Sequence, residues 1–125
     1  MSPDQLKYST THEWVAIEGD TATIGITDFA AQLLSDLVFA DLPPVGKKLI
    51  QGQPFGEVES VKAVSDMYAP VSGEIVEVNT ALPGQLETLG KDPYGAGWIV
   101  RIRPDDQAEM GTLLDQAAYD ALVKS

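Results

Sequence analysis

Residues 52–78 read GQPFGEVESVKAVSDMYAPVSGEIVEV and contain the clearest structural pattern in the chain. Apolar residues fall into short strand-like segments at 55–61, 64–69 and 74–79, which Gly, Pro and Ser separate. Lys62 lies where the first two segments meet, with Gly52 before it and Gly73 after it. If the chain folds back at this point, Lys62 occupies the tip of a β-hairpin. From this spacing alone, an ordinary surface lysine in a turn is the preferred interpretation.

The chain before this stretch predicts a hairpin, a short helix and a further strand. Alternating residues place strands at 12–18 and 21–26, and Gly19 in the turn between them suits the twist of a β-hairpin. A strand at 37–42 ends at two prolines. Between these strands, Thr27 or Asp28 caps a short helix, whose apolar residues at helical spacing are Phe29, Leu33 and Leu34.

The chain after this stretch predicts a loop, a last strand and a C-terminal helix. Residues 80–97 are expected to form the loop. In a strand at 98–103, Trp98, Val100 and Ile102 share one face. Asp115 caps a helix whose apolar positions, at helical spacing, are Ala117, Ala118, Ala121 and Leu122. Many short strands without a βαβ pattern predict a small barrel or sandwich that forms a single domain, residues 1–125.

Composition and charge exclude several classes of function. The formal net charge is -11 and only 8 residues are Lys or Arg, so the chain lacks the basic surface that nucleic acid requires. No apolar run approaches the roughly 20 residues that cross a bilayer. The N-terminal residues also lack the features of a secretion signal. We therefore expect a bacterial cytoplasmic protein that binds neither nucleic acid nor membrane.

Catalytic chemistry also lacks the residues that it needs. The chain has no cysteine and a single histidine, His12, so neither a thiolate site nor a multi-histidine metal site is possible. Nucleophile-elbow, phosphate-loop and dinucleotide-binding motifs are absent from the sequence. Glu57 and Glu59 share one strand face, and we interpret them as solvated carboxylates rather than as a catalytic pair. We expect no catalytic residues and no metal ligands, and hence no enzyme.

The segment around Lys62 resembles a known attachment motif. Residues 59–63, Glu-Ser-Val-Lys-Ala, with Gly52 before them and Ala-Pro-Val-Ser-Gly at 69–73, are similar to the swinging-arm motif of lipoyl domains. Their form resembles the glycine cleavage H-protein family in particular. Further similar segments follow in the same order along nearly the whole chain from Tyr8, at 12–15, 24–28, 92–95 and 97–98. One departure lies at 82–90, where a more Asn-rich loop is expected, so the shape and partner contacts of this loop stay open.

This resemblance implies a fold and a cofactor. The implied fold is mainly β, a barrel-sandwich hybrid of the lipoyl-domain type with a short internal helix. It includes a lipoyl hairpin at about 50–79 and a C-terminal helix at about 115–124. The implied cofactor is lipoic acid, joined through an amide bond to Lys62. The amide removes the charge of the lysine and places a dithiolane ring at the end of a long flexible arm.

The resemblance also implies a carrier function in glycine catabolism. The arm takes the aminomethyl group of glycine from the P protein, a pyridoxal-phosphate decarboxylase, to the T protein, an aminomethyltransferase. It then delivers reducing equivalents to the L protein, a dihydrolipoyl dehydrogenase. Lipoyl-attaching enzymes are the remaining partners, and a monomer suits a chain that docks with several of them. The chain itself is a shuttling substrate rather than a catalyst.

Two groups of site residues follow from the resemblance. The lipoyl-attaching enzymes recognise a hairpin tip whose residues besides Lys62 are Glu59, Ser60, Val61, Ala63, Val64 and Asp66. A surface cleft holds the amine of the loaded arm, with Glu13 as its main group and Thr11 and Asp66 beside it. Turn packing is the alternative interpretation of the first group, and an ordinary hairpin carboxylate is that of Glu13. We expect His12 to be structural or to form hydrogen bonds.

Other functions are compatible with parts of the sequence. Biotin carriers resemble lipoyl domains in fold but usually flank their lysine with methionines, whereas Val61 and Ala63 flank Lys62. Lipoyl modules of 2-oxoacid dehydrogenases normally belong to longer chains. An unlipoylated H-like β-domain, acting as a protein-interaction or lipoyl-relay module, stays open as the alternative.

Overall fold

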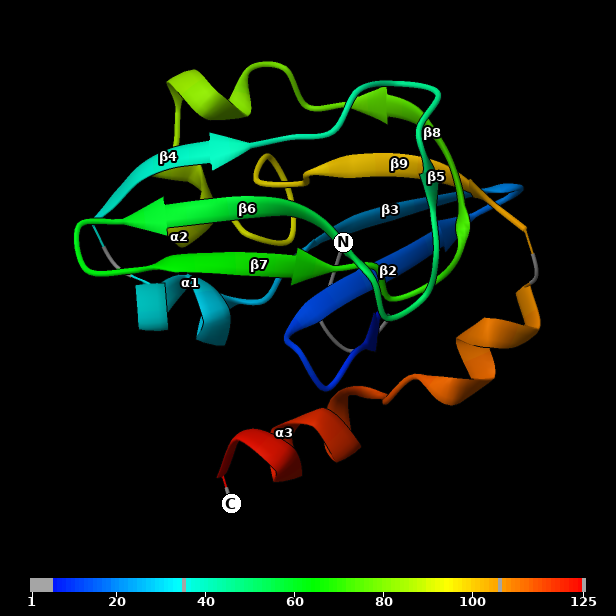
Figure 1. Ribbon diagram of the computed structural model, residues 1–125. Coiled ribbons are helices and arrows are strands. Elements are labelled where there is room, and N and C mark those ends of the chain that lie inside the picture. The colour runs from blue at the N-terminus through cyan, green and yellow to red at the C-terminus, as the bar shows by residue number, and fades with distance from the viewer. Residues whose placement is uncertain (1–5, 35, 106, 125) are drawn as a thin grey trace.

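The computed structural model describes residues 6–34, 36–105 and 107–124, and these form two antiparallel sheets (Figure 1). The larger sheet has six strands in the order β1-β2-β3-β9-β8-β5, with bounds Lys7–Tyr8, Glu13–Glu18, Thr21–Ile26, Val100–Pro104, Gly73–Val78 and Lys48–Leu49. The smaller sheet has the order β4-β6-β7, with bounds Leu37–Asp41, Pro54–Ser60 and Val64–Tyr68. The expectation of a mainly β, sandwich-like fold is confirmed.

Short helices occupy the connections and the C-terminal region. They are α1, η2, α2, η3 and α3, with bounds Asp28–Leu34, Leu82–Gly84, Thr88–Lys91, Gln107–Thr112 and Gln116–Lys124. In Figure 1, α1 lies beside the turn between β6 and β7, and α3 lies on the outside of the larger sheet. Among the described residues, no helix is both long enough and apolar enough to cross a membrane.

The main core fills the space between the two sheets. The inward face of β3 contributes Ile24, and the smaller sheet contributes Phe55 and Met67, all of them buried. Burying a side chain of this size stabilises the folded state by about 1.5–3 kcal/mol. The two sheets are therefore held together by this layer, and the turn between β6 and β7 is left at the edge of the molecule (Figure 1).

A second, smaller cluster covers the outer face of β1 and β2. Its buried members are Leu6, Tyr8, Trp14, Ala16 and Tyr119, and the last of these comes from α3. The rings of Tyr8 and Tyr119 are stacked, with their centroids 4.7 Å apart. This cluster attaches α3 to the sheet.

Several predicted elements are confirmed closely. The first hairpin pairs β2 with β3 from Glu13↔Ile26 to Glu18↔Thr21. The Thr27 hydroxyl accepts a hydrogen bond from the N–H of Ala30 at 3.2 Å, so Thr27 rather than Asp28 caps α1. The carboxylate of Asp115 accepts a hydrogen bond from the N–H of Ala118 at 2.9 Å and caps α3 as expected.

The lipoyl hairpin is shorter than the predicted range of 50–79. β6 pairs with β7 within the smaller sheet, whereas β8 pairs with β9 and β5 in the larger one. The predicted loop at 80–97 contains η2 and α2, which bury Leu82 and Leu89. The strands β1 and β5 and the helix η3 were not predicted, because two-residue strands and a single 3-10 segment carry no periodic signal.

The apolar faces that we predicted for the last strand and for the helices α1 and α3 are partly wrong. The last strand begins at Val100 rather than at Trp98, which packs against the outer cluster while Val100 lies in the main core. On α3 the predicted alanines are exposed, and Tyr119 is the buried residue. On α1, Leu33 is 67% exposed, and the side chain of Leu34 lies outside the described part of the structure.

Candidate functional site

Lys62 lies in the turn that joins β6 to β7, as the sequence predicted. The last paired residues of the two strands are Glu59 and Val64, so residues 60–63 form the hairpin tip. Lys62 is exposed, and so are Val61 and Ala63 on either side of it. In the described part of the chain, its side chain has no hydrogen bond or ion pair with another residue.

Ser60 fixes the backbone of the hairpin tip. Its hydroxyl oxygen accepts hydrogen bonds from the N–H groups of Lys62 and Ala63, each at 3.2 Å. The backbone N–H of Ser60 donates to the carbonyl of Ala63 at 2.8 Å. The N–H of Val61 donates to the carbonyl of Asp36 at 3.3 Å, which ties the tip to the segment before β4. The backbone is therefore held in place while the lysine side chain extends into solvent.

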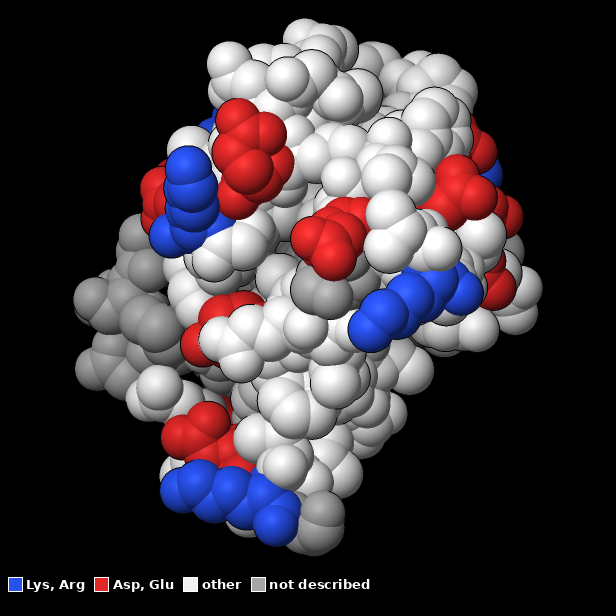
Figure 2. Space-filling view, turned by 90° about the vertical axis from the view of Figure 1, so that its left-hand side faces the viewer, with Lys and Arg blue, Asp and Glu red and all other residues white. Residues whose placement is uncertain are grey.

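The other residues predicted at the tip lie along the two strands. Glu59 is half-buried on β6, and Val64 is 56% exposed at the start of β7. Asp66 is exposed and pairs with Glu57 across the hairpin. It lines a shallow hollow with Asp41, Lys47 and Glu57. Figure 2 shows the end of the molecule that holds the tip, where acidic and basic side chains lie in small groups among uncharged surface.

Glu13 is a buried carboxylate at the start of β2, with 2% of its surface exposed. One of its oxygens, Oε1, accepts hydrogen bonds from the hydroxyl of Ser9, at 2.6 Å, and from the hydroxyl of Thr11. The other oxygen, Oε2, accepts one from the backbone N–H of Tyr68 at 3.2 Å. The structure thus brings Glu13 and Thr11 together, at the point where β2 meets the end of β7.

The electrostatics of Glu13 follow from this environment. Burial raises the pKa of the Glu13 carboxyl above its ordinary value, and the hydrogen bonds from Ser9, Thr11 and Tyr68 oppose that rise. All of these donors are neutral. The ion pairs found among the described residues, Lys48–Asp105 and Arg101–Glu77, lie elsewhere. The charge of this carboxylate is therefore not paired within the described chain, which suits it to hold a protonated amine.

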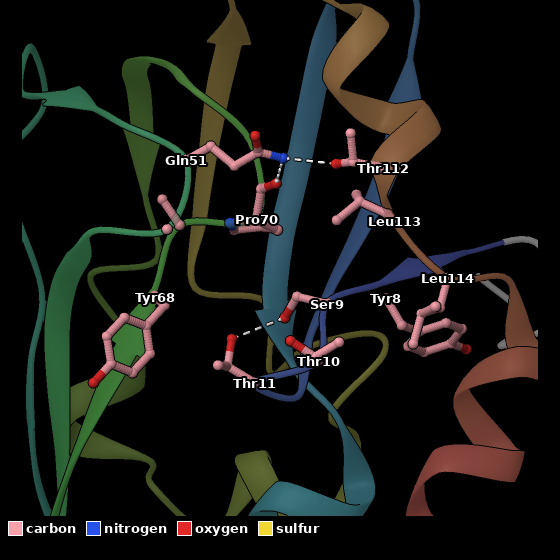
Figure 3. A pocket seen from close by; sticks show the side chains of 12 residues that line it. Tyr8, Ser9, Thr10, Thr11, Gln51, Tyr68, Pro70, Thr112, Leu113 and Leu114 are labelled. Carbon is pink, nitrogen blue, oxygen red and sulfur yellow. Dashed lines mark hydrogen bonds between the residues drawn. The ribbon is translucent and has the colours of Figure 1, made fainter.

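A hollow of about 330 Å³ opens beside the hydroxyl partners of Glu13. Figure 3 shows Thr11 and Tyr68 at one end of it and Gln51 and Thr112 at the other. The side-chain amide of Gln51 donates to the carbonyl of Pro70 at 3.0 Å and to the Thr112 hydroxyl at 2.9 Å. Neutral hydroxyls and an amide thus provide the polar side chains of this hollow.

Glu13 and Lys62 are separated along β7. The chain runs from Lys62 at the tip to Tyr68, whose N–H binds Glu13. At about 3.3 Å per residue, this path covers roughly 20 Å. Asp66 lies between the two, but its side chain lines the hollow with Glu57, and no hydrogen bond joins it to Glu13 among the described residues. A group attached to Lys62 must therefore fold back along the hairpin to approach Glu13.

Sequence reasoning missed part of the surroundings of Glu13. Ser9 could have been found, because its hydroxyl lies close to Glu13 in the sequence and follows the same pattern as Thr11. The N–H of Tyr68 gives no such signal, because its contact with Glu13 joins residues far apart in the chain. The expectation that His12 forms hydrogen bonds is confirmed, and its partner is the Tyr119 hydroxyl at 2.8 Å.

Comparison with known proteins places this geometry in a family. The family model described as glycine cleavage H-protein matches residues 6–125. A glycine cleavage system H protein of Symbiobacterium thermophilum is 52% identical over 122 residues, which cover 98% of this chain and 95% of the relative. One of Rubrobacter xylanophilus is 54% identical over 108 residues, 86% of each chain.

A solved structure agrees with these relatives. The crystal structure of a glycine cleavage system H protein from Mycobacterium marinum has a TM-score of 0.90 and 42% sequence identity. The match covers 99% of this chain and 100% of that protein. The similarity therefore includes both sheets and the C-terminal helix, and not the hairpin alone.

Proposed function

This chain belongs to the glycine cleavage H-protein family, and we propose that it is a lipoyl carrier whose arm is attached to Lys62. The observation that supports this proposal most strongly is the position of Lys62, exposed at a hairpin tip whose backbone Ser60 fixes. A modifying enzyme needs an amine that it can reach and a backbone that stays in place. The tip offers both.

The residues around Lys62 fit an amide-linked lipoyl group. The lysine side chain makes no hydrogen bond or ion pair within the described chain, so acylation of its amine breaks no such contact. Once bound, the lipoyl group supplies a disulfide that accepts a one-carbon amine fragment and two electrons. Glu59, Val61, Ala63 and Asp66 present the surface that the lipoyl-attaching enzymes recognise, and the buried Ser60 holds the backbone of the tip beneath it.

We propose that the chain serves the P, T and L proteins of glycine cleavage in turn. It receives the aminomethyl group at the P protein, delivers it to the T protein and passes reducing equivalents to the L protein. The bacterial sources of the relatives favour a bacterial cytoplasm as the place of this cycle. The residues of the chain present and protect the arm, and the partner enzymes perform the reactions.

Glu13 protects the amine that the arm carries. Its carboxylate has neutral hydrogen-bond donors and no cationic partner in the described chain, so a protonated amine completes the site. A loaded arm held here would be shielded from water, whose attack on the aminomethyl carbon would otherwise release ammonium and formaldehyde and leave the thiol. By excluding water and holding the amine, Glu13 slows this loss with Thr11 beside it, whereas Asp66, which lines a separate hollow with Glu57, is left out of this cleft.

A reconstituted reaction tests the carrier function. Lipoylated protein is mixed with P, T and L proteins, glycine, tetrahydrofolate and NAD, and NADH is followed. We expect turnover with the parent chain and none with Lys62→Arg, which keeps the charge but cannot be lipoylated. Turnover with Lys62→Arg would contradict the assignment. No turnover with a lipoylated parent would contradict the carrier function, whereas a parent that the ligase cannot lipoylate would favour the unlipoylated, partner-binding alternative.

A matched pair of carboxylate variants tests the role of Glu13. We expect Glu13→Ala to be lipoylated normally and to lose ammonium faster from the loaded arm. Glu18→Ala, which removes an exposed carboxylate from the same strand, should behave as the parent does. An unchanged rate of ammonium release in Glu13→Ala would remove Glu13 from the cleft.

A further inference from the structure

The C-terminal helix α3 packs on the outer cluster, and the hydroxyl group of Tyr119 adds hydrogen bonds to the turn before β2 and to the start of α1. Tyr119 is the buried residue of this helix, and its ring stacks on Tyr8. The Tyr119 hydroxyl lies 2.8 Å from Nδ1 of His12 and 2.7 Å from the Thr27 hydroxyl. It therefore joins three segments that are far apart in the sequence: the turn before β2, the start of α1 and the C-terminal helix.

His12 closes the turn that leads to Glu13. Its backbone adopts a left-handed conformation, with φ of 76°, which is uncommon for a residue other than glycine. The His12 N–H donates to the carbonyl of Ser9 at 3.2 Å, and the His12 carbonyl accepts from the N–H of Thr27 at 3.0 Å. Contacts with Tyr119 and Phe29 surround its ring. The residue at the end of the turn is thus fixed through both its backbone and its side chain.

The same turn carries the hydroxyl groups that bind Glu13. Ser9 and Thr11 both donate to Oε1 of the carboxylate, and the N–H of Glu13 donates back to the Ser9 hydroxyl at 3.0 Å. Any movement of the turn therefore moves the donors away from the carboxylate. Through His12, the position of these donors depends on Tyr119.

The hydrogen-bond chain is satisfied in more than one proton arrangement. If Nδ1 of His12 carries a proton, it donates to Tyr119, which then donates to Thr27. If Nδ1 is unprotonated, Tyr119 donates to it and accepts from the Thr27 hydroxyl. In both cases the Tyr119 hydroxyl is the central member, so its removal breaks the link at both ends.

We propose that Tyr119 is a positioning residue, which holds the Ser9–His12 turn and so keeps Glu13 in place to protect the amine on the lipoyl arm. This inference rests on the proposed function, since it assigns the C-terminal helix a part in the protection that Glu13 provides. The contacts of Tyr119 are with Tyr8, His12 and Thr27. It acts through the turn.

Hydrogen exchange on the unlipoylated protein tests the contact itself. Tyr119→Phe keeps the stacked ring and removes only the hydroxyl. We expect the amides of His12, Glu13 and Thr27 to exchange about five-fold faster, the effect of losing one hydrogen bond. The amide of Ile24 in the core strand β3 serves as the internal reference and should not change. The proposal would be overturned if the turn amides of Tyr119→Phe exchanged at the parent rate, or if the amide of Ile24 were accelerated as much as the turn amides.

Tyr94→Phe is the matched control for this substitution. Tyr94 is also partly buried, and its hydroxyl donates to the Asp28 carboxylate at 2.8 Å, at the start of α1. This hydrogen bond joins Tyr94 to Asp28 and not to a residue of the Ser9–His12 turn. We expect the exchange rates of the turn to stay at the parent values in this variant. His12→Asn, which tolerates the left-handed backbone and can still bond Tyr119, should retain most of the protection.

Ammonium release from the loaded arm tests the consequence. Tyr119→Phe should be lipoylated normally and release ammonium about five-fold faster, whereas adding it to Glu13→Ala should have no further effect, because it acts through Glu13. A parent-like rate in Tyr119→Phe alone, or an additive effect in the double variant, would overturn the role of Tyr119. A parent-like rate in Glu13→Ala would instead contradict the proposed function of Glu13, and with it the link from Tyr119 to the arm.

Discussion

Lys62 and Glu13 occupy opposite environments, although the strand β7 connects them. Lys62 is exposed at a tip whose backbone is tied by Ser60, whereas Glu13 is 2% exposed and bonded to neutral donors. An exposed amine suits chemical attachment because an enzyme can reach it. A buried carboxylate without a cationic partner suits the binding of a protonated amine, because the loss of water around the carboxylate strengthens its attraction to a positive charge.

The hydroxyl of Ser60 is expected to affect both stability and lipoylation. Ser60→Ala removes the acceptor of the Lys62 and Ala63 N–H groups, so the free energy of unfolding should fall by about 1 kcal/mol. The kcat/KM of lipoylation should fall as well, because the tip backbone is then less well held. Ser65→Ala on the neighbouring strand is the control. Urea unfolding and a ligase assay measure the two effects, and equal losses in both variants would contradict the role of Ser60.

Burial of Glu13 predicts a pH-dependent stability. Burial raises the pKa of Glu13 in the folded protein above its ordinary value of 4.5, which the unfolded chain keeps. The folded protein therefore binds more protons than the unfolded chain just above pH 4.5. The stability that this proton binding contributes is fully present below pH 4.5 and is lost as the pH rises through the higher pKa of the folded state. Glu13→Gln lacks this contribution. The difference in free energy of unfolding, parent minus variant, should therefore decrease with rising pH in that window, and a constant difference would contradict the raised pKa.

The sequence predicted individual residues only where their signal was local. The tip position of Lys62 follows from two adjacent strand patterns, and the cap at Asp115 follows from the helix that begins beside it. The bonds of Glu13 to Tyr68 and of His12 to Tyr119 depend on how distant segments pack. No pattern within one segment records such a contact, so the structure was needed to find them.

At the level of elements, regular alternation was a good guide and short or irregular segments were not. The β2–β3 hairpin has a clear period in its sequence, so its predicted strands agree with the structure, in which one face lies in the main core and the other packs in the outer cluster. The strand β5 has only Lys48 and Leu49, and it exists because β8 provides a partner for it. The predicted loop at 80–97 contains the helix α2, whose buried residue is Leu89. This helix has only four residues, which is too short to show a helical repeat in the sequence.

The buried face of α3 shows why spacing alone can mislead. Alanines recur along this helix at helical positions, yet they are exposed, and the larger Tyr119 occupies the interface. A tyrosine buries much more apolar area than an alanine and can bond through its hydroxyl, so it determines which face packs. The large side chain of Tyr119, and not the repeat of alanines, therefore determines the buried face of α3.

Close packing between β2 and β3 predicts a large effect of a small substitution. A Cβ atom at Gly25 would lie 2.6 Å from the indole ring of Trp14, which is buried and donates to the Pro93 carbonyl at 3.0 Å. Gly25→Ala should therefore lower the free energy of unfolding by about 1–3 kcal/mol and change the tryptophan fluorescence. Gly90→Ala in α2, where a Cβ meets nothing within 4 Å, should be neutral or stabilising. Equal destabilisation of both variants would contradict this packing.

The whole molecule separates a rigid body from an accessible tip. The core between the sheets and the outer cluster around Trp14 hold the strands, while the turn of residues 60–63 extends at one end (Figure 1). The net charge of -11 keeps such a molecule soluble and favours encounters with basic surfaces on partner enzymes. The helix α3 packs on the outer cluster through Tyr119. This arrangement suits a protein that presents one group to several partners.

The most direct test of the carrier function is the intact mass of the protein after incubation with a lipoate ligase, ATP and lipoic acid. Lys62→Arg is treated in the same way, and its thermal unfolding is compared with that of the parent to show that the fold is retained. We expect the parent to gain the mass of a single lipoyl group and the variant to gain nothing. A lipoyl group on Lys62→Arg, or none on the parent, would contradict Lys62 as the site of attachment.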